Sequence, residues 1–303
     1  MNETAELFFL ERVANKLVEE YGANLYKTTI VLPSNRAKSY FSKYLFDIAG
    51  KPILLPNLVQ MSQWVQQLSG YTTANKMSLI LLVYEAYTNV VKNPEPFEIF
   101  TKWGITALDD FNQIDSSLVQ SSELFKNLRD IKDIESWSFD SDELAESQIQ
   151  FENFWMQLGE VYYEFIRLQE ERKQFSYARI NRLMAENKIA SCEDEVVIVG
   201  LSSFSIAEEK WLNDLNKKGN IHFEFDADCY YVNNPQHEAG IFFRKWEKAG
   251  HSFSKSNDFE KFKREITISK VVTPLASAFA AAKLVNEMSP QEREGCAVVL
   301  TQP

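Results

Sequence analysis

Thr28–Leu45, TTIVLPSNRAKSYFSKYL, is the stretch that decides the fold. Its first five residues are a short run rich in β-branched side chains, which predicts a buried strand. Pro33 then marks a tight turn, and Ser34 or Asn35 can cap a helix by accepting a backbone hydrogen bond. The apolar residues of that helix recur at spacings of three and four: Tyr40, Phe41, Tyr44, Leu45 and Ile48. A strand, a turn and a helix in this order open a parallel α/β sheet.

A second unit of the same kind lies far along the chain, at Glu195–Leu215. Its strand, EVVIVG at Glu195–Gly200, lacks polar alternation, which is typical of an interior parallel strand covered on both faces. A helix is expected from about Ile206 onward. We expect the two units to lie side by side in one sheet, with their strands as neighbours and a helical insertion between them in the sequence.

The residues between these units have a helical pattern from about Asn75 to Asn187, with few glycines. We expect about five helices there: Met77–Val91, Phe97–Asp115, Ser117–Leu128, Ser141–Glu171 and Tyr177–Glu186. Further short strands are expected at Ile53–Leu55, Ile221–Phe225, Ile266–Val271 and Cys296–Leu300. Ile53–Leu55 should lead into a helix from Leu58, a loop is expected at Ser252–Lys263, and an Ala-rich helix at Pro274–Met288. The final strand suggests that the chain is the front part of a longer polypeptide.

The composition limits the classes of function. The 303 residues carry a formal net charge of -11, so nucleic acid is not expected to wrap the whole surface, although local basic patches remain possible. The three cysteines, Cys192, Cys229 and Cys296, are far apart and form no disulfide framework, which favours the cytoplasm. The N-terminus is not a signal peptide, and no apolar run is long enough for a membrane helix.

Four stretches resemble, in the same order, segments of one bacterial protein family. TTIVLPSNRAKSYFSKYL is similar to the strand and helix that helicases carry at motif Ia, and KPILLPNLVQMSQWV to the strand and helix that follow. VVIVGLSSFSIAEEKWLNDL is similar to the strand that holds the Walker B acids in active relatives. FDADCYYVNNPQHEAGIFFRKW resembles a signature of a Bacteroidetes-type branch. The family is the AddB-like proteins, inactivated superfamily I helicases of RecBCD/AddAB-type double-strand-break repair.

The resemblance implies a RecA-like parallel α/β domain made of residues 1–57 and 193–250, split by an all-helical insertion of residues 58–192. Residues 264–303 would then begin a second RecA-like α/β domain, truncated at the end of the chain. The implied function is that of a non-catalytic, helicase-like scaffold that binds DNA, as a single strand or a duplex end, and an AddA-like helicase-nuclease subunit. In that family a PD-(D/E)XK nuclease domain follows at the far C-terminus.

The departures from active helicases indicate that this segment is not an enzyme. Phosphate binding in these nucleotide hydrolases needs the pattern G-x-x-x-x-G-K-[ST], which this chain lacks. The strand at Val196–Val199 leads to Gly200, Leu201 and two serines, whereas magnesium needs a carboxylate pair there. No cofactor and no catalytic residue is therefore predicted.

Two groups of residues are candidates for DNA contact. The first is Asn35, Arg36, Lys38 and Lys43, because a helix N-terminus offers free N–H groups to a phosphate. A capped helix with solvated charges is the alternative. The second is the basic stretch that contains Arg167, Arg172, Arg179 and Arg182. These arginines could instead pair with Glu170, Glu171 and Glu186 along the helix.

No metal site is predicted. Glu224, Asp226 and Asp228 suit magnesium by spacing, but a solvated strand end is the favoured interpretation because the lysine and further acid of a nuclease are missing. His222, His237 and His251 are isolated. The aromatic residues of the helical region, except Trp137, are expected in its core. Two other functions stay open: a protein-interaction module without a DNA role, and an atypical nucleotide hydrolase.

Overall fold

The computed structural model describes residues 8–50, 53–125, 146–186, 195–251, 253–261 and 265–299. The chain divides into two compact units, Met1–Asn257 and Asp258–Pro303. Trp137 and Cys192, named above, lie outside the described residues.

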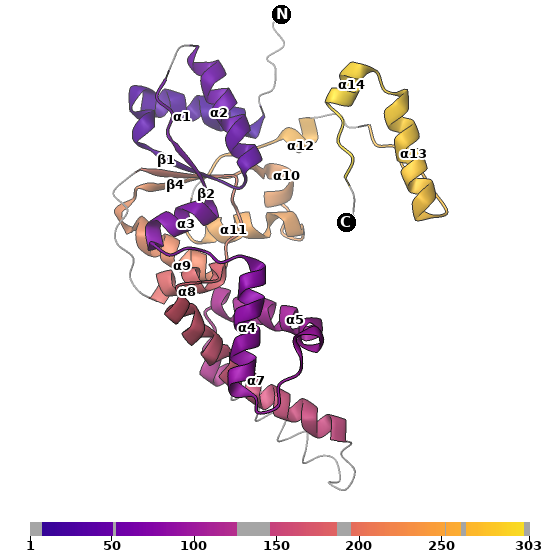
Figure 1. Ribbon diagram of the computed structural model, residues 1–303. Helices are drawn as coiled ribbons and strands as arrows, with labels where there is room; N and C mark the ends of the chain where they lie inside the picture. Colours follow the sequence, from indigo (N-terminus) through magenta and orange to yellow (C-terminus); the bar gives the residue numbers. More distant parts are fainter. Residues whose placement is uncertain are drawn as a thin grey trace, which may run out of the picture. The chain divides into compact units, whose positions relative to one another are not determined.

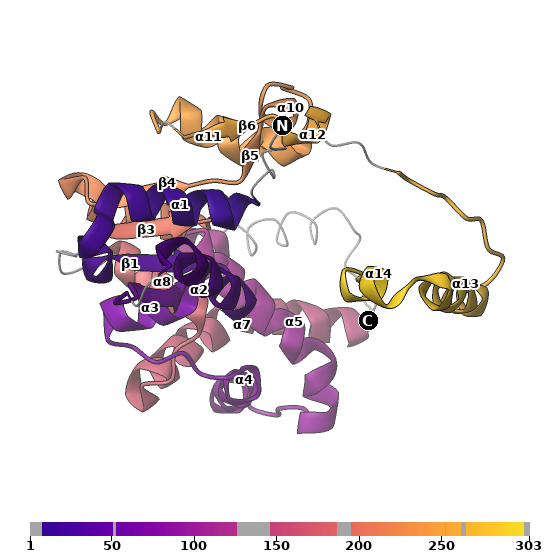
Figure 2. The same ribbon diagram turned by 90° about the horizontal axis from the view of Figure 1, so that it is seen from above.

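The first unit is mixed α/β and contains a parallel four-stranded sheet (Figures 1 and 2). The strand order is β2-β1-β3-β4. The strands are β1 (Thr29–Leu32), β2 (Asn57–Gln60), β3 (Val196–Val199) and β4 (Ile221–Glu224). Thr29 pairs with Val196 and Val31 with Ile198, which confirms that the two distant strand segments are neighbours. Both central strands are buried along their whole length, as their unbroken apolar sequences predict.

Helices cover both faces of this sheet (Figure 1). On one face α1 (Phe9–Tyr21) and α2 (Asn35–Ala49) pack against Ile30, Leu32, Val197 and Val199. On the other face, side chains of α3 (Met61–Ser69), α8 (Tyr177–Glu186), α9 (Ile206–Leu215) and α11 (Ile241–Lys248) pack against Val31, Val196 and Ile198. Alternate residues of a strand point to opposite faces, so each central strand contributes to two hydrophobic cores.

The described residues between β2 and β3 contain no strand apart from an isolated bridge between Thr73 and Phe175. They form α3, α4 (Lys76–Val90), α5 (Phe97–Ser116), α7 (Glu146–Arg172) and α8, with a further helical stretch at residues 121–125. α4, α5 and α7 share a third hydrophobic core, which includes Val83, Phe111 and Phe165. α8 contacts both α5 and α9, so it links this core to the sheet.

The second strand lies a few residues later than predicted. Ile53–Leu55 has no regular structure, and the strand is Asn57–Gln60. Pro56 has no backbone N–H, so the ladder begins with the Asn57 N–H, which donates to the Thr28 carbonyl at 3.0 Å. The following helix therefore begins at Met61 rather than at Leu58.

The segment after β4 folds back on itself through a second, two-stranded parallel sheet. β5 (Ala227–Asp228) pairs with β6 (Lys255–Ser256), where a loop was predicted. Between them lie α10 (Cys229–Val232), the 3-10 turn η3 (Glu238–Gly240) and α11. A strand of two residues is too short to show an alternating pattern in the sequence. β5 and β6 are therefore recognised only from their pairing in the structure.

The second unit contains α12 (Asp258–Lys261), α13 (Pro274–Glu287) and α14 (Pro290–Glu294). The strand predictions at Ile266–Val271 and Cys296–Leu300 are wrong for the residues described there, which form no strand. A strand needs a neighbour to bond its backbone, and no other strand is present in the described part of this unit. Apolar side chains of both segments are exposed, among them Ile268 at 90% and Val299 at 84%.

Candidate nucleic-acid interface

Three helices begin at the edge of the sheet where the parallel strands end. α2 follows β1 through Pro33 and Ser34, α3 follows β2 directly, and α9 follows β3 through residues 200–205. The free N–H groups of helix N-termini carry partial positive charge. The chain order also reverses here, because β1 continues to β2 on one side and pairs with β3 on the other. Ligands of open α/β sheets bind outside the strand ends at such a point.

The N-terminal half of α2 carries cations that have no carboxylate partner among the described residues. The Ala37 N–H donates to the Ser34 side chain at 3.1 Å, so Ser34 is the cap, one of the two residues predicted for this role. Arg36 and Lys43 are exposed, and the Lys38 ammonium donates to the Gln63 amide oxygen of α3 at 3.5 Å. Within the described residues, none of these three cations is ion-paired with a carboxylate. Asn35 is also exposed, in the first turn of the helix.

β3 and the loop that follows it, residues 200–205, contain no acidic residue. Gly200 has a φ of +72°, which favours glycine, and a Cβ added there would lie 3.4 Å from the Phe9 ring and 4.0 Å from Pro33. Ser202 is held by its carbonyl, which accepts from the Trp246 indole at 3.0 Å. Glu208, the first acid further on, bonds Ser205 and Tyr177. In this loop Phe204 packs in the core, and the Ser205 side chain caps α9.

The acidic residues at the end of β4 and just after it have structural partners. Glu224 pairs with Lys16 of α1 at 2.6 Å. Asp228 accepts from the Tyr230 N–H at 2.9 Å and from the Ser256 hydroxyl at 3.2 Å, so it caps α10 and joins the two short strands. His237 caps η3 and His222 bonds Glu195. Among the described residues, no group of three or more His, Cys, Asp or Glu is arranged to hold a metal ion.

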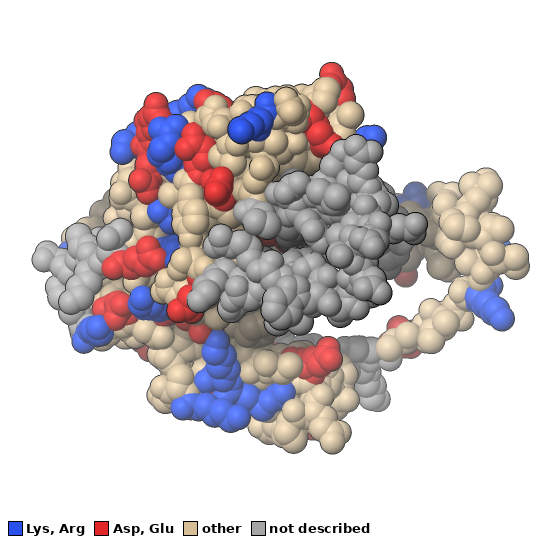
Figure 3. All heavy atoms as spheres, turned by 90° about the horizontal axis from the view of Figure 1, so that it is seen from below, with Lys and Arg blue, Asp and Glu red and all other residues tan. Residues whose placement is uncertain are grey.

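The exposed surface of the first unit mixes charges of both signs. Figure 3 shows acidic side chains interspersed with basic ones over much of the described part of one face. Arg167 pairs with Glu164 at 2.8 Å and with Glu171 at 2.6 Å, and Arg172 pairs with Glu85 of α4. The hydrogen bond from Arg167 lowers the pKa of Glu164 to about 2. These two arginines are therefore already neutralised by neighbouring carboxylates.

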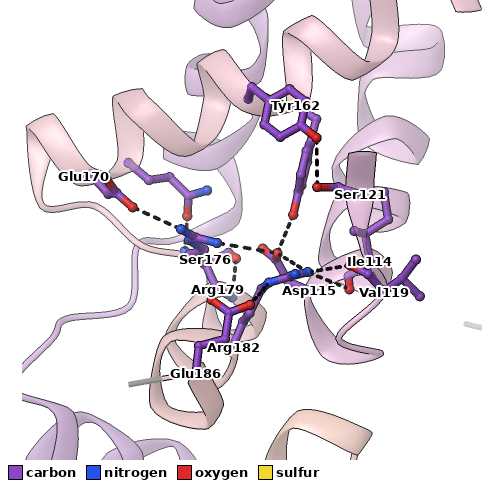
Figure 4. A network of polar contacts seen from close by, with 12 residues as sticks. Ile114, Asp115, Val119, Ser121, Tyr162, Glu170, Ser176, Arg179, Arg182 and Glu186 are labelled. Carbon is purple, nitrogen blue, oxygen red and sulfur yellow. Dashed lines mark hydrogen bonds and ion pairs between the residues drawn. The ribbon is translucent and has the colours of Figure 1, made fainter. Parts of the chain in front are cut away.

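Arg179 and Arg182 are buried, and both guanidinium groups point toward Asp115 (Figure 4). Their Nη1 atoms lie 3.9 and 3.6 Å from Asp115 Oδ1, to which the Tyr162 hydroxyl donates at 2.6 Å. Arg182 also donates to the carbonyls of Ile114 and Val119. Burial raises the pKa of Asp115, against the hydrogen bond from Tyr162 and the two guanidinium charges. These arginines hold α5, α7 and α8 together and present no surface to a phosphate.

The predicted DNA-contact residues thus separate into two groups. Asn35, Arg36, Lys38 and Lys43 share α2, whereas the four arginines belong to the helical core or to ion pairs. Sequence reasoning missed Gln63, which links Lys38 to α3, and Phe9, which covers Gly200. It also placed Tyr40 in the buried stripe of α2, whereas Tyr40 is 52% exposed. The spacing of four residues between Arg36 and Tyr40 was the sequence feature that could have placed both side chains on the same face of the helix.

Comparison with known proteins gives no family: no protein-family model matches the chain, and no curated protein matches it. None of the described helices combines the length and the apolar character required to cross a membrane.

Proposed function

We propose that this chain is a non-catalytic, helicase-like segment that binds DNA, and that it belongs to an AddB-like recombination nuclease. The observation that carries the proposal is the position of α2. Its first turn lies at the carboxyl edge of a parallel sheet, beside the switch point, with Arg36 and Lys38 unneutralised in the described part of the chain. A phosphate at this edge would meet side-chain cations and free helix N–H groups together.

The proposal also includes a specific fold for this segment. The sheet would be a RecA-like domain, with residues 58–192 as an insertion into it. Two observations support this: β1 and β3 are parallel neighbours, and the helices between β2 and β3 have a hydrophobic core of their own. An AddA-like subunit is the proposed partner in the cytoplasm, and the nuclease domain of the family is proposed to follow this segment.

The absence of nucleotide hydrolysis is proposed from the end of β3. The position that carries magnesium-binding acids in active helicases is occupied by Gly200 and Leu201, with Phe9 and Pro33 packed beside the glycine. A bound magnesium-nucleotide complex would need oxygen ligands at this place, and a glycine and a leucine supply none.

Fluorescence anisotropy with a labelled DNA end tests the DNA contact. The double substitution Arg36→Glu and Lys38→Glu should weaken binding, and the slope of log affinity against log salt should fall by about one for each cation that contacts a phosphate. The matched control is Lys92→Glu with Lys102→Glu, which changes the net charge equally on exposed residues of the helical region.

Equal weakening by the control pair would mean that only the net charge matters, and would reject a site on α2. Tight ATP binding by the purified protein, abolished by substitutions at Ser34–Arg36, would instead favour a nucleotide hydrolase.

A further inference from the structure

The exposed face of α2 carries an aromatic ring between its cations. Tyr40 is 52% exposed, four residues after Arg36 and three before Lys43. Residues three and four apart are neighbours on a helix surface, so these three side chains form one stripe. Phe41 and Leu45, on the opposite side of α2, are fully buried against the sheet at 0% exposure. The stripe Arg36–Tyr40–Lys43 therefore faces solvent.

The ring of Tyr40 has a supporting neighbour. Tyr44 lies one turn further on, with its ring centroid 6.5 Å from that of Tyr40 and the ring planes 31° apart. Tyr44 is half-buried and packs against the core beneath α2, so it anchors this side of the aromatic surface. α2 has no acidic residue in its first turn, and Asp47 lies one turn beyond Lys43. The stripe is positive over its first two turns in a chain that is acidic as a whole.

We propose that this stripe binds single-stranded DNA, with one base stacked on Tyr40 and the adjoining phosphates held by Arg36 and Lys43. The inference rests on the proposed function and names its substrate as an unpaired strand. Arg36 and Lys43 are seven residues apart, about 10 Å along the helix axis, and the ring lies between them. Bases in a duplex are stacked on each other, so only an unpaired base offers its face to a tyrosine.

Charge complementarity favours single-stranded DNA as the ligand of this stripe. A phosphate chain supplies regularly spaced negative charge, and the cations of α2 are not ion-paired in the described part of the protein. Aromatic side chains between cations are typical of surfaces that bind single strands without sequence preference.

Three labelled probes of equal length separate stacking from phosphate binding: an oligo(dT) strand, an abasic strand and a blunt duplex. Tyr40→Ala should bind the oligo(dT) strand about 5- to 100-fold more weakly, the effect of losing one stacked base. Its affinity for the abasic strand and the duplex should stay within about twofold of wild type, because the phosphate contacts remain. Tyr40→Trp should keep the affinity for oligo(dT).

The matched control is Tyr163→Ala, an exposed tyrosine (46%) of α7 that lies between Glu160 and Glu164 in the sequence. It should leave all three affinities unchanged. If Tyr40→Ala leaves oligo(dT) binding unchanged while Arg36→Glu weakens every probe, the stacking inference fails and the proposed function stands. A protein partner on this face would also leave the Tyr40→Ala affinities unchanged. If wild-type protein binds none of the probes, both proposals fail.

Discussion

Asp115 shows how a single buried carboxylate organises the helical region. It is 1% exposed and receives the Tyr162 hydroxyl from α7 and two guanidinium groups from α8. α5 and the consecutive helices α7 and α8 therefore meet at one charge. An isolated charge in such a place would be strongly unfavourable, so the members of this network depend on each other.

Removing this carboxylate should destabilise the fold. Asp115→Ala leaves the Tyr162 hydroxyl without its acceptor and removes the carboxylate that Arg179 and Arg182 share. The two arginines keep their pairs with Glu170 and Glu186. We therefore expect a loss of about 2–3 kcal/mol in the free energy of unfolding. Asp109→Ala on the same helix is the control, because Asp109 is exposed and its pair with Lys76 is 3.7 Å long. That control should change stability by no more than about 1 kcal/mol. Urea unfolding measures both, and similar values for the two variants would contradict the role given to Asp115.

His251 should make stability depend on pH. It is half-buried between aromatic rings, 4.7 Å from the Trp246 centroid and 5.7 Å from the Phe223 centroid, and burial lowers its pKa. The unfolded chain therefore binds a proton below about pH 6.5 that the folded protein resists. Stability should fall as the pH decreases from 7.5 to 5.5, and this fall should be smaller in His251→Gln. Equal pH dependence of the two proteins in thermal unfolding would exclude this effect.

At the scale of elements, one arginine fixes the loop between β5 and α11. The Arg244 guanidinium donates to five backbone carbonyls, of which Tyr231, Asn234 and His237 lie at 2.8–3.0 Å. Gly240 allows this approach, because a Cβ there would lie 2.1 Å from Arg244 Nη1 and 2.2 Å from the Tyr231 carbonyl oxygen. The loop geometry gives a physical reason for an arginine at position 244 and a glycine at position 240.

Arg244→Lys should loosen this loop without unfolding the protein. An ammonium has three donors and no planar fork, so it cannot satisfy the same carbonyls. Hydrogen exchange should become faster at His237 and Gly240, whose N–H groups bond carbonyls within the loop, while β3 stays protected. Lys248→Ala, an exposed change on the same helix, is the control. Unchanged exchange in Arg244→Lys would show that the loop is held by other contacts.

The elements that the sequence predicted well are those with a strong local signal. The prediction for Tyr177–Glu186 matches α8, and that for Phe97–Asp115 differs from α5 by one residue, because helical spacing continues to their ends. The buried strands β1 and β3 and their pairing were also predictable, since unbroken β-branched runs suit the centre of a parallel sheet.

The features that the sequence did not predict depend on contacts between residues that are far apart in the chain. Arg179 and Arg182 form part of a dense basic stretch, and nothing local shows that Asp115 buries them. The orientation of Tyr40 follows from which side of α2 meets the sheet. Arg36, Lys38 and Lys43 could be chosen from the sequence because the helix N-terminus that follows a strand is a local feature. Gln63 and Phe9 could not, because they reach this edge from other elements.

At the scale of the whole molecule, the buried residues gather in one of the two units. The three hydrophobic cores draw all their members from Met1–Asn257, whereas α12, α13 and α14 have no buried residue. Since burial of apolar surface is the main favourable term in folding, the stability of the chain should come from the first unit.

A protein that ends at Asn257 should therefore unfold cooperatively, with a thermal midpoint within about 2 °C of the whole chain, since a change of 1 kcal/mol moves the midpoint by about 2–4 °C at this size. Circular dichroism measures the transition. A control that ends at Gly240 removes α11 and with it Trp246, which is 4% exposed and packs against Phe204, Phe223 and Phe225. That protein should lose its sharp transition, because the core beside β4 is then open to water. A broad transition already in the protein that ends at Asn257 would mean that residues after Asn257 stabilise the sheet.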